Sequence, residues 1–242
     1  MKKATVFIIT LLLATTVSHA QWGKKKIKGN GKVTTITRST SDYDAVKVAG
    51  FFDVELVAGT EGNITLKGES NLLEYVMTEV DGDVLKIKTK KGYNLRTSKR
   101  QSLVITVPFQ DISKVSLSGS GDVYTKDTIK ADSFGMALAG SGDVIIDVET
   151  GKLKMAVSGS GDMTATGTAD NAEIALSGSG DIHAYKLTAK SAKVSLAGSG
   201  DIRVHATDYL KARVAGSGDI TYKGKPAKQD TKVAGSGSIS MN

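Results

Sequence analysis

Apolar and polar residues alternate along most of the chain after residue 33. Between residues 113 and 242 the alternation carries a recurring motif, apolar-x-apolar-[Ser/Ala]-Gly-Ser-Gly-Asp-[Val/Ile/Met]. Successive side chains of a β-strand point to opposite faces, so an alternation of period two predicts strands that bury one face. The pattern therefore predicts an all-β protein built from equivalent strand-rich units.

The spacing of the motif identifies the kind of β protein. Its first glycine falls at Gly119, Gly140, Gly159, Gly178, Gly198, Gly216 and Gly235, in steps of 21, 19, 19, 20, 18 and 19 residues. This period is too short for a helical-hairpin repeat or a propeller blade, and it matches one coil of a β-solenoid. We expect a β-solenoid with regular coils of about 19 residues over residues 113–242.

The apolar positions beside the motif form two regular rows. One row is Val115, Met136, Met155, Ile174 and Val194, and the other is Val123, Val144, Met163, Ile182, Ile202, Ile220 and Ile239. One coil cannot bury its apolar face alone, so we expect equivalent residues to stack in register at ~4.8 Å per coil. The glycines either face inward in an extended strand or bend the chain at a corner, and the sequence leaves both readings open.

The aspartates of the motif are the candidate binding residues. They are Asp122, Asp143, Asp162, Asp181, Asp201 and Asp219. In stacked coils they form one outward row, in which unit charges ~4.8 Å apart repel by roughly 0.9 kcal/mol in water. We expect each carboxylate to accept backbone N–H groups of its own turn. Screening by lysines and bound Ca²⁺ between coils are the alternatives, but the calcium-binding nonapeptide has half this period, so no cofactor is expected.

Residues 34–112 lack the motif but show strand-like alternation. The stretch "VAGFFDV", residues 48–54, is a degenerate copy with Phe51 and Phe52 in place of Ser and Gly, and it is expected to begin or cap the solenoid. "ESNLLEYVMTEV" predicts a short helical turn before a strand, and "VDGDVLKIK" predicts a hairpin with Asp81-Gly82 at its turn. At the other end Ser238 replaces the motif aspartate. Nearby Lys and Pro residues are expected to discourage stacking by another molecule, and the alternative is that this end pairs with a partner.

The first twenty residues have the features of a signal peptide. Lys2 and Lys3 precede an apolar stretch of 14 residues, and small residues stand at Ser18 and Ala20. The chain has no cysteine, hence no lipid-anchor motif and no disulfide, and no later stretch is apolar and long enough for a transmembrane helix. We expect an exported protein that stays in the periplasm, reaches the cell surface or is released.

The positive charge of the chain is uneven. The whole chain carries +7, and residues 21–242 carry +5 once Lys2 and Lys3 are removed. Part of the excess lies in a basic N-terminal arm, residues 21–33, which is either a solvated terminus or a contact for acidic surface polymers or lipid head groups. An exported chain without an aromatic and basic platform is not expected to bind nucleic acid.

The sequence offers little catalytic chemistry. His19 falls within the signal peptide, and His183 and His205 show no triad arrangement with the repeated Ser and Asp residues. The alternative to a non-enzyme is a β-helical polysaccharide lyase or hydrolase. Its nearest candidate site is Asp181, His183, Asp201 and Arg203, on adjacent coils of one outward row. Chance placement on a polar face is the simpler explanation of this group, so the protein is not expected to be an enzyme.

The order of these segments resembles a known family. A signal peptide, "VAGFFDVELVAG", "NLLEYV" with "DGDVLKIK", "LVITVP" and the Ser-Gly-Ser-Gly-Asp coils are similar to the auto-transporter adhesins with a head GIN domain, exported proteins of Bacteroidetes-type bacteria. The resemblance covers residues 34–242. It implies a right-handed β-helix with a cell-surface adhesion, binding or structural role toward a glycan or protein, and it brings no catalytic residues onto this chain.

Overall fold

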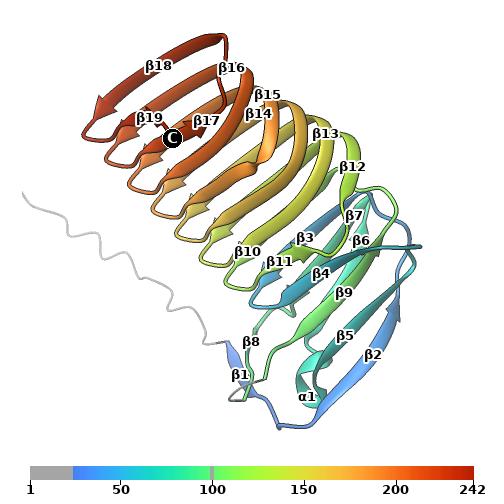
Figure 1. Cartoon of the computed structure of the whole chain (residues 1–242). Helices are drawn as coiled ribbons and strands as arrows, with labels where there is room; N and C mark the ends of the chain where they lie inside the picture. The colour runs from blue at the N-terminus through green and yellow to red at the C-terminus, as the bar shows by residue number, and fades with distance from the viewer. Residues whose placement is uncertain (1–23, 99–100) are drawn as a thin grey trace, which may run out of the picture.

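The computed structural model describes residues 24–98 and 101–242 as a β-solenoid (Figure 1). Its elements in chain order are β1 (Lys25–Lys28), β2 (Val33–Ser39), β3 (Ala45–Gly50), β4 (Asp53–Ala58), β5 (Asn63–Glu69), α1 (Ser70–Leu73), β6 (Val76–Asp81), β7 (Val84–Thr89), β8 (Tyr93–Arg96), β9 (Val104–Phe109), β10 (Lys114–Gly119), β11 (Val123–Thr125), β12 (Ile129–Gly140), β13 (Val144–Gly159), β14 (Met163–Gly178), β15 (Ile182–Gly198), β16 (Ile202–Gly216), β17 (Ile220–Lys223), β18 (Lys228–Gly235) and β19 (Ile239–Met241). The signal peptide expected over residues 1–20 lies outside the described residues.

The regular coils stack in parallel and in register from β10 to β19 (Figure 1). The first glycines of successive motifs are backbone partners along the whole stack, from Gly119 opposite Gly140 to Gly216 opposite Gly235. Each long strand from β13 to β16 begins after one glycine corner and ends at the next. The predicted β-solenoid, with coils of about 19 residues, is confirmed.

Both predicted apolar rows line the core. Val115, Met136, Met155, Ile174 and Val194 are successive partners and are buried. The second row is buried as well, from Val123 to Ile220, and its last member, Ile239, is half-buried in β19, which pairs with β17 alone among the described strands. Identical stacking gives each side chain an apolar neighbour above and below, which supplies the burial that a single coil lacks.

The chain bends at the motif glycines, so the corner interpretation holds. Gly119 has a φ of +140°, in the region that favours glycine. A Cβ atom on Gly119 would lie 1.9 Å from the carbonyl oxygen of Gly50 in the neighbouring coil, and one on Gly121 would lie 2.0 Å from that of Phe52. Glycine is required at both positions because two backbones touch there.

The degenerate motif forms two strands and a corner that stack on the first regular coil. Gly50 in β3 is the partner of Gly119 and Val54 in β4 is the partner of Val123, which confirms that residues 48–54 are a copy of the motif. These two strands lie between β10–β11 on one side and β7 with β9 on the other. Phe52 occupies the place of the second glycine and is fully buried, since the layer beyond it has no matching corner.

Antiparallel strands close the N-terminal end (Figure 1). β6 pairs antiparallel with β7, and β5 pairs antiparallel with β2 and β9. The predicted helical turn is α1, and the predicted hairpin is β6–β7. Its turn lies one residue later than the expected Asp81-Gly82, because Asp81 still pairs with Val84 and Gly82-Asp83 form the turn. The strands on both sides of residues 112 and 113, the expected division, belong to one 17-stranded sheet.

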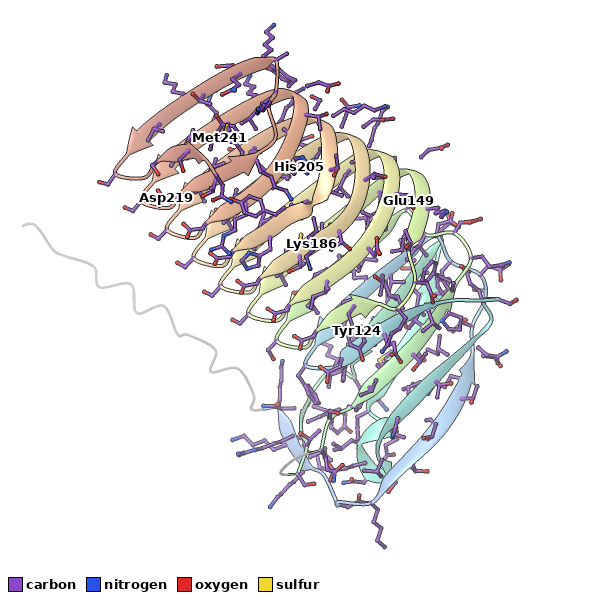
Figure 2. All side chains as sticks on the ribbon, in the orientation of Figure 1. Tyr124, Glu149, Lys186, His205, Asp219 and Met241 are labelled. Carbon is purple, nitrogen blue, oxygen red and sulfur yellow. The ribbon has the colours of Figure 1, made fainter. Side chains whose placement is uncertain are left out.

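The two termini of the described chain differ. Part of the basic arm is ordered, because Lys25–Lys28 form β1 beside β8. At the opposite end β18 pairs with β16 alone and β19 with β17 alone among the described strands, and Met241 there is 55% exposed (Figure 2). Within residues 24–98 and 101–242, no helix is apolar and long enough to cross a membrane.

Candidate binding surfaces

The motif aspartates form one row along the glycine edge of the stack. Figure 2 shows Asp219 on this edge and Glu149 on the opposite one. Each carboxylate accepts the backbone N–H of its counterpart in the next coil through Oδ1. The donor–acceptor pairs are Asp143 to Asp122 (3.0 Å), Asp162 to Asp143 (3.1 Å), Asp181 to Asp162 (2.8 Å), Asp201 to Asp181 (2.8 Å) and Asp219 to Asp201 (2.9 Å). We call this row the aspartate ladder.

The source of the N–H groups corrects the sequence-based expectation. The carboxylates do accept backbone N–H groups, as expected, but the donor belongs to the next coil and not to the same turn. The stacking distance between coils explains this, since it places each carboxylate beside the amide of its counterpart. One oxygen of each carboxylate is thus used to join two coils.

The ladder also includes an aspartate outside the regular repeats. Asp53, in the degenerate copy, faces the backbone N–H of Asp122. Burial raises the pKa of Asp53 above its ordinary value, the Asp122 N–H opposes this shift, and the charge of Asp122 adds to it. Asp122 itself is exposed, whereas the next five aspartates are half-buried.

The described residues do not form a cluster of ligands for Ca²⁺, the alternative role of the motif aspartates. Among the described residues, no three His, Cys, Asp or Glu side chains lie close enough to hold a metal ion together. Each coil contributes one motif aspartate, and Oδ1 of that residue is already a hydrogen-bond acceptor for the next coil. Ca²⁺ prefers six to eight oxygen ligands around one centre.

The candidate enzymatic group comes together only in part. His183 and Arg203 are partners on adjacent coils, and His183 Nδ1 lies 3.2 Å from Arg203 Nη1 on the exposed face. The carboxylates of Asp181 and Asp201 instead belong to the aspartate ladder. His205 is not part of this group. Burial lowers its pKa, and the nearby positive charge of Lys223 lowers it further.

A groove follows the outer face of the strands that precede the glycine corners. Its volume is about 890 Å³. Two rows of small outward side chains line it: Ser116, Ala137, Ala156, Ala175 and Ser195 in one, and Ser118, Ala139, Ser158, Ser177 and Ala197 in the other. Because these side chains are short, the core residues Leu117, Leu138 and Leu176 also reach the groove. We call this the Ala/Ser groove.

The charges in the Ala/Ser groove gather near the N-terminal coils. Lys47, Lys86 and Lys114 line that end. At the far end the row continues from Ser195 to Arg213, whose guanidinium is bound to the Asp230 carboxylate at 2.6 Å and to its carbonyl oxygen at 2.7 Å. The groove therefore combines an apolar floor, serine hydroxyls and cations at one end. Sequence reasoning missed it, although the small residue at the "x" position of the first five regular motifs was its signal.

Comparison with solved structures supports the fold. A "putative adhesin" from Bacteroides fragilis matches with 26% identity and a TM-score of 0.81, over 89% of this chain and 100% of that one. A "putative lipid binding protein" from Parabacteroides distasonis matches with 30% identity and a TM-score of 0.75, over 90% and 100%. A "putative adhesin" from the same species has 27% identity and a TM-score of 0.72, over 90% and 100%. A search of curated proteins found no match.

The family comparison covers most of the described solenoid. Residues 42–226 match the family described as "Putative auto-transporter adhesin, head GIN domain". The match begins just before β3 and ends after β17, so it contains the degenerate coil, the ladder from Asp53 to Asp219 and the Ala/Ser groove. The chain therefore belongs to the head GIN domain family of auto-transporter adhesins, as the resemblance read from its motifs implied.

Proposed function

We propose that the protein is an exported, adhesin-type binding protein, without catalytic activity, that holds the aliphatic part of a surface amphiphile in the Ala/Ser groove. The observation that carries this function is the groove itself, an apolar channel that crosses several coils. From Ser116 to Ser195 the row spans four coil steps, or roughly 19 Å. An elongated ligand matches this shape.

The chemistry of the groove favours an anionic amphiphile. Each methylene that leaves water for an apolar floor contributes about 0.8 kcal/mol to binding. Lys47 and Lys114 at one end would pair with a carboxylate or phosphate head group. None of the residues that line the groove is aromatic, so it lacks the ring faces on which sugars stack.

Both kinds of relative are consistent with this proposal. One solved structure with 30% identity is described as a lipid binding protein, and the family as adhesins. Binding a lipid of another cell or of the same envelope is one way to adhere. A ligand of surface glycan or protein would use the flanks of the coils instead. The polysaccharide lyase or hydrolase alternative receives no support from His183 and Arg203, since the neighbouring carboxylates serve the ladder.

The test is displacement of a fluorescent fatty acid from the purified chain, residues 21–242. Ala156→Trp combined with Ala175→Trp fills the groove and should weaken binding at least tenfold. Ile145→Trp is the matched control, because Ile145 is 49% exposed on the sheet that follows the corner and does not line the groove. Lys47→Glu should weaken binding of the fatty acid more than it weakens binding of a neutral alcohol of equal chain length.

A groove without this function gives a different result. Equal affinity in the double variant and in wild type would place the fatty acid elsewhere and remove the proposal. Retention of labelled protein on a glycan array, with no fatty-acid binding, would assign adhesion to sugars instead.

A further inference from the structure

The positive charge of the chain is concentrated in two short segments. Residues 24–32 and 88–96 contain nine cations and no acidic residue: Lys24, Lys25, Lys26, Lys28, Lys32, Lys88, Lys90, Lys91 and Arg96. Residues 21–242 carry a net charge of +5, so everything outside these two segments carries −4. These two segments are therefore strongly basic, while the rest of residues 21–242 has a net negative charge.

The fold brings the two segments into direct contact. β1 and β8 pair in parallel, with Lys25 opposite Tyr93 and Lys28 opposite Arg96. The Lys25 N–H donates to the carbonyl oxygen of Gly92 at 2.8 Å, which fixes the register. Among the described residues only one of the nine cations, Lys88, forms an ion pair, with Glu79. The other eight form no ion pair among the described residues, so an anion bound beside them would meet complementary charge.

A pocket lies between this ribbon and the first glycine corner. It has a volume of about 460 Å³ and is lined by Lys24, Lys90 and Lys91 together with Phe51 and Tyr93. Backbone of the corner, at Gly50 and Gly119, forms another part of its wall. We call it the basic pocket.

Both rings of the basic pocket are held in place from behind. The Tyr93 ring packs on Tyr75 with a centroid distance of 4.5 Å, and the Phe51 ring packs on Phe52 at 4.9 Å. Phe51 stands where every regular motif has serine. The degenerate copy therefore places an aromatic ring beside the lysines that line the pocket.

We propose that the basic pocket binds an acidic sugar unit of an extracellular polysaccharide. Lysines supply charge for a carboxylate or sulfate group, and the rings supply an apolar surface for the C–H face of the sugar. An anionic bilayer fits less well, because Phe51 and Tyr93 are half-buried in the pocket wall, whereas rings that insert into a membrane are exposed. This ligand is independent of the Ala/Ser groove, so the protein would have two separate binding sites.

The experiment measures binding of the purified chain, residues 21–242, to oligogalacturonate and to heparin fragments by calorimetry. Neutral dextran of the same length and phosphatidylglycerol vesicles are the comparison ligands. Lys90→Glu with Lys91→Glu should weaken acidic oligosaccharide binding at least tenfold. Lys225→Glu with Lys232→Glu is the matched control, with the same change in net charge on exposed residues at the other end of the solenoid.

A further variant separates the pocket from charge alone. Phe51→Ser restores the motif residue, leaves every lysine in place and should weaken acidic oligosaccharide binding three- to tenfold. Fatty-acid binding in the groove should not change in any of these variants, so failure here and failure of the proposed function are distinguishable. Equal losses in the two lysine pairs, no effect of Phe51→Ser, or binding to vesicles without binding to oligosaccharides would each overturn the proposal.

Discussion

The backbone N–H and the hydroxyl of Ser238 both donate to Oδ1 of Asp219, at 2.7 and 2.9 Å. Ser238 takes the place of the motif aspartate in the last described coil. Its N–H continues the hydrogen-bond pattern of the aspartate ladder, and its hydroxyl adds a second donor to the same carboxylate oxygen. A serine at this position therefore joins the coil to its neighbour without adding a negative charge.

Removing one carboxylate of the ladder should weaken the join between two coils. In Asp162→Ala the N–H of Asp181 loses its acceptor, and we expect the free energy of unfolding to fall by about 1 to 2 kcal/mol. Asp162→Asn keeps an acceptor oxygen and should lose less. Asp170→Asn is the control, because Asp170 forms only an exposed ion pair with Lys190. Urea denaturation measures all three, and equal stability of the Ala variant and wild type would contradict a structural ladder.

The corner glycines should not tolerate a side chain. A Cβ atom on Gly142 would lie 1.9 Å from the carbonyl oxygen of Gly121, so Gly142→Ala forces two coils apart and should cost about 3 kcal/mol or more. Gly135 lies on the preceding strand, and its nearest neighbour to an added Cβ is 3.8 Å away. Gly135→Ala should be neutral or slightly stabilising. Thermal melting of the two variants compares them directly.

The buried carboxylate of Glu69 should make stability depend on acidic pH. Burial alone would raise its pKa, but hydrogen bonds from the Ser98 N–H and hydroxyl and from the Gly31 N–H outweigh burial, so the pKa lies below its ordinary value. A lowered folded-state pKa gives stability that is present above the unfolded value and is lost as the pH falls. Glu69→Gln should therefore reduce stability at neutral pH and flatten its decline from about pH 5 downward.

Unfolding in urea at a series of pH values measures this effect. Glu173→Gln is the control, because the Glu173 side chain is 65% exposed and its carboxylate lies 4.0 Å from Lys154. If Glu69→Gln and wild type lose stability in parallel as the pH falls, other carboxylates account for the acid sensitivity.

Phe52 should be the most costly residue of the degenerate copy to truncate. Its ring fills the end of the core where the neighbouring layer has no glycine corner, and it is fully buried. Phe52→Ala leaves a cavity and should cost about 3 to 5 kcal/mol. Phe51→Ser, at a half-buried ring, should cost less. A cost for Phe52→Ala below that for Phe51→Ser in chemical denaturation would be evidence against this packing.

The regular part of the fold is readable from the residues because one short pattern fixes both face and register. Val115 and Met136 are partners for the reason that their motifs align, and the same argument paired Val123 with Val144. The copy at Val48–Val54 was also visible, since five of its seven letters keep the apolar, small or acidic character of the motif. Because the motif repeats, aligning its copies is enough to predict which residues far apart in the sequence are strand partners.

The remainder of the fold depends on contacts between segments that share no repeated motif. Leu85 pairs with Val46 although their segments share only alternation, and Lys25 pairs with Tyr93 although nothing in either segment marks a partner. The acceptor role of Asp162 was predicted, but its donor depended on the distance between coils. The Ala/Ser groove needed a three-dimensional surface, because small residues at one motif position show only that no bulky group stands there.

The displaced position of residues 45–58 has a consequence for the order of assembly. Their coil lies between strands that come later in the chain. β3 therefore completes its pairing only when β7 has joined it on one side and β10, almost seventy residues away, on the other. Every coil from β12 onward needs only its immediate predecessor. We expect closure of these long early loops to be the slow step of folding, because it costs the most chain entropy. The later coils can then add one at a time, each on its predecessor.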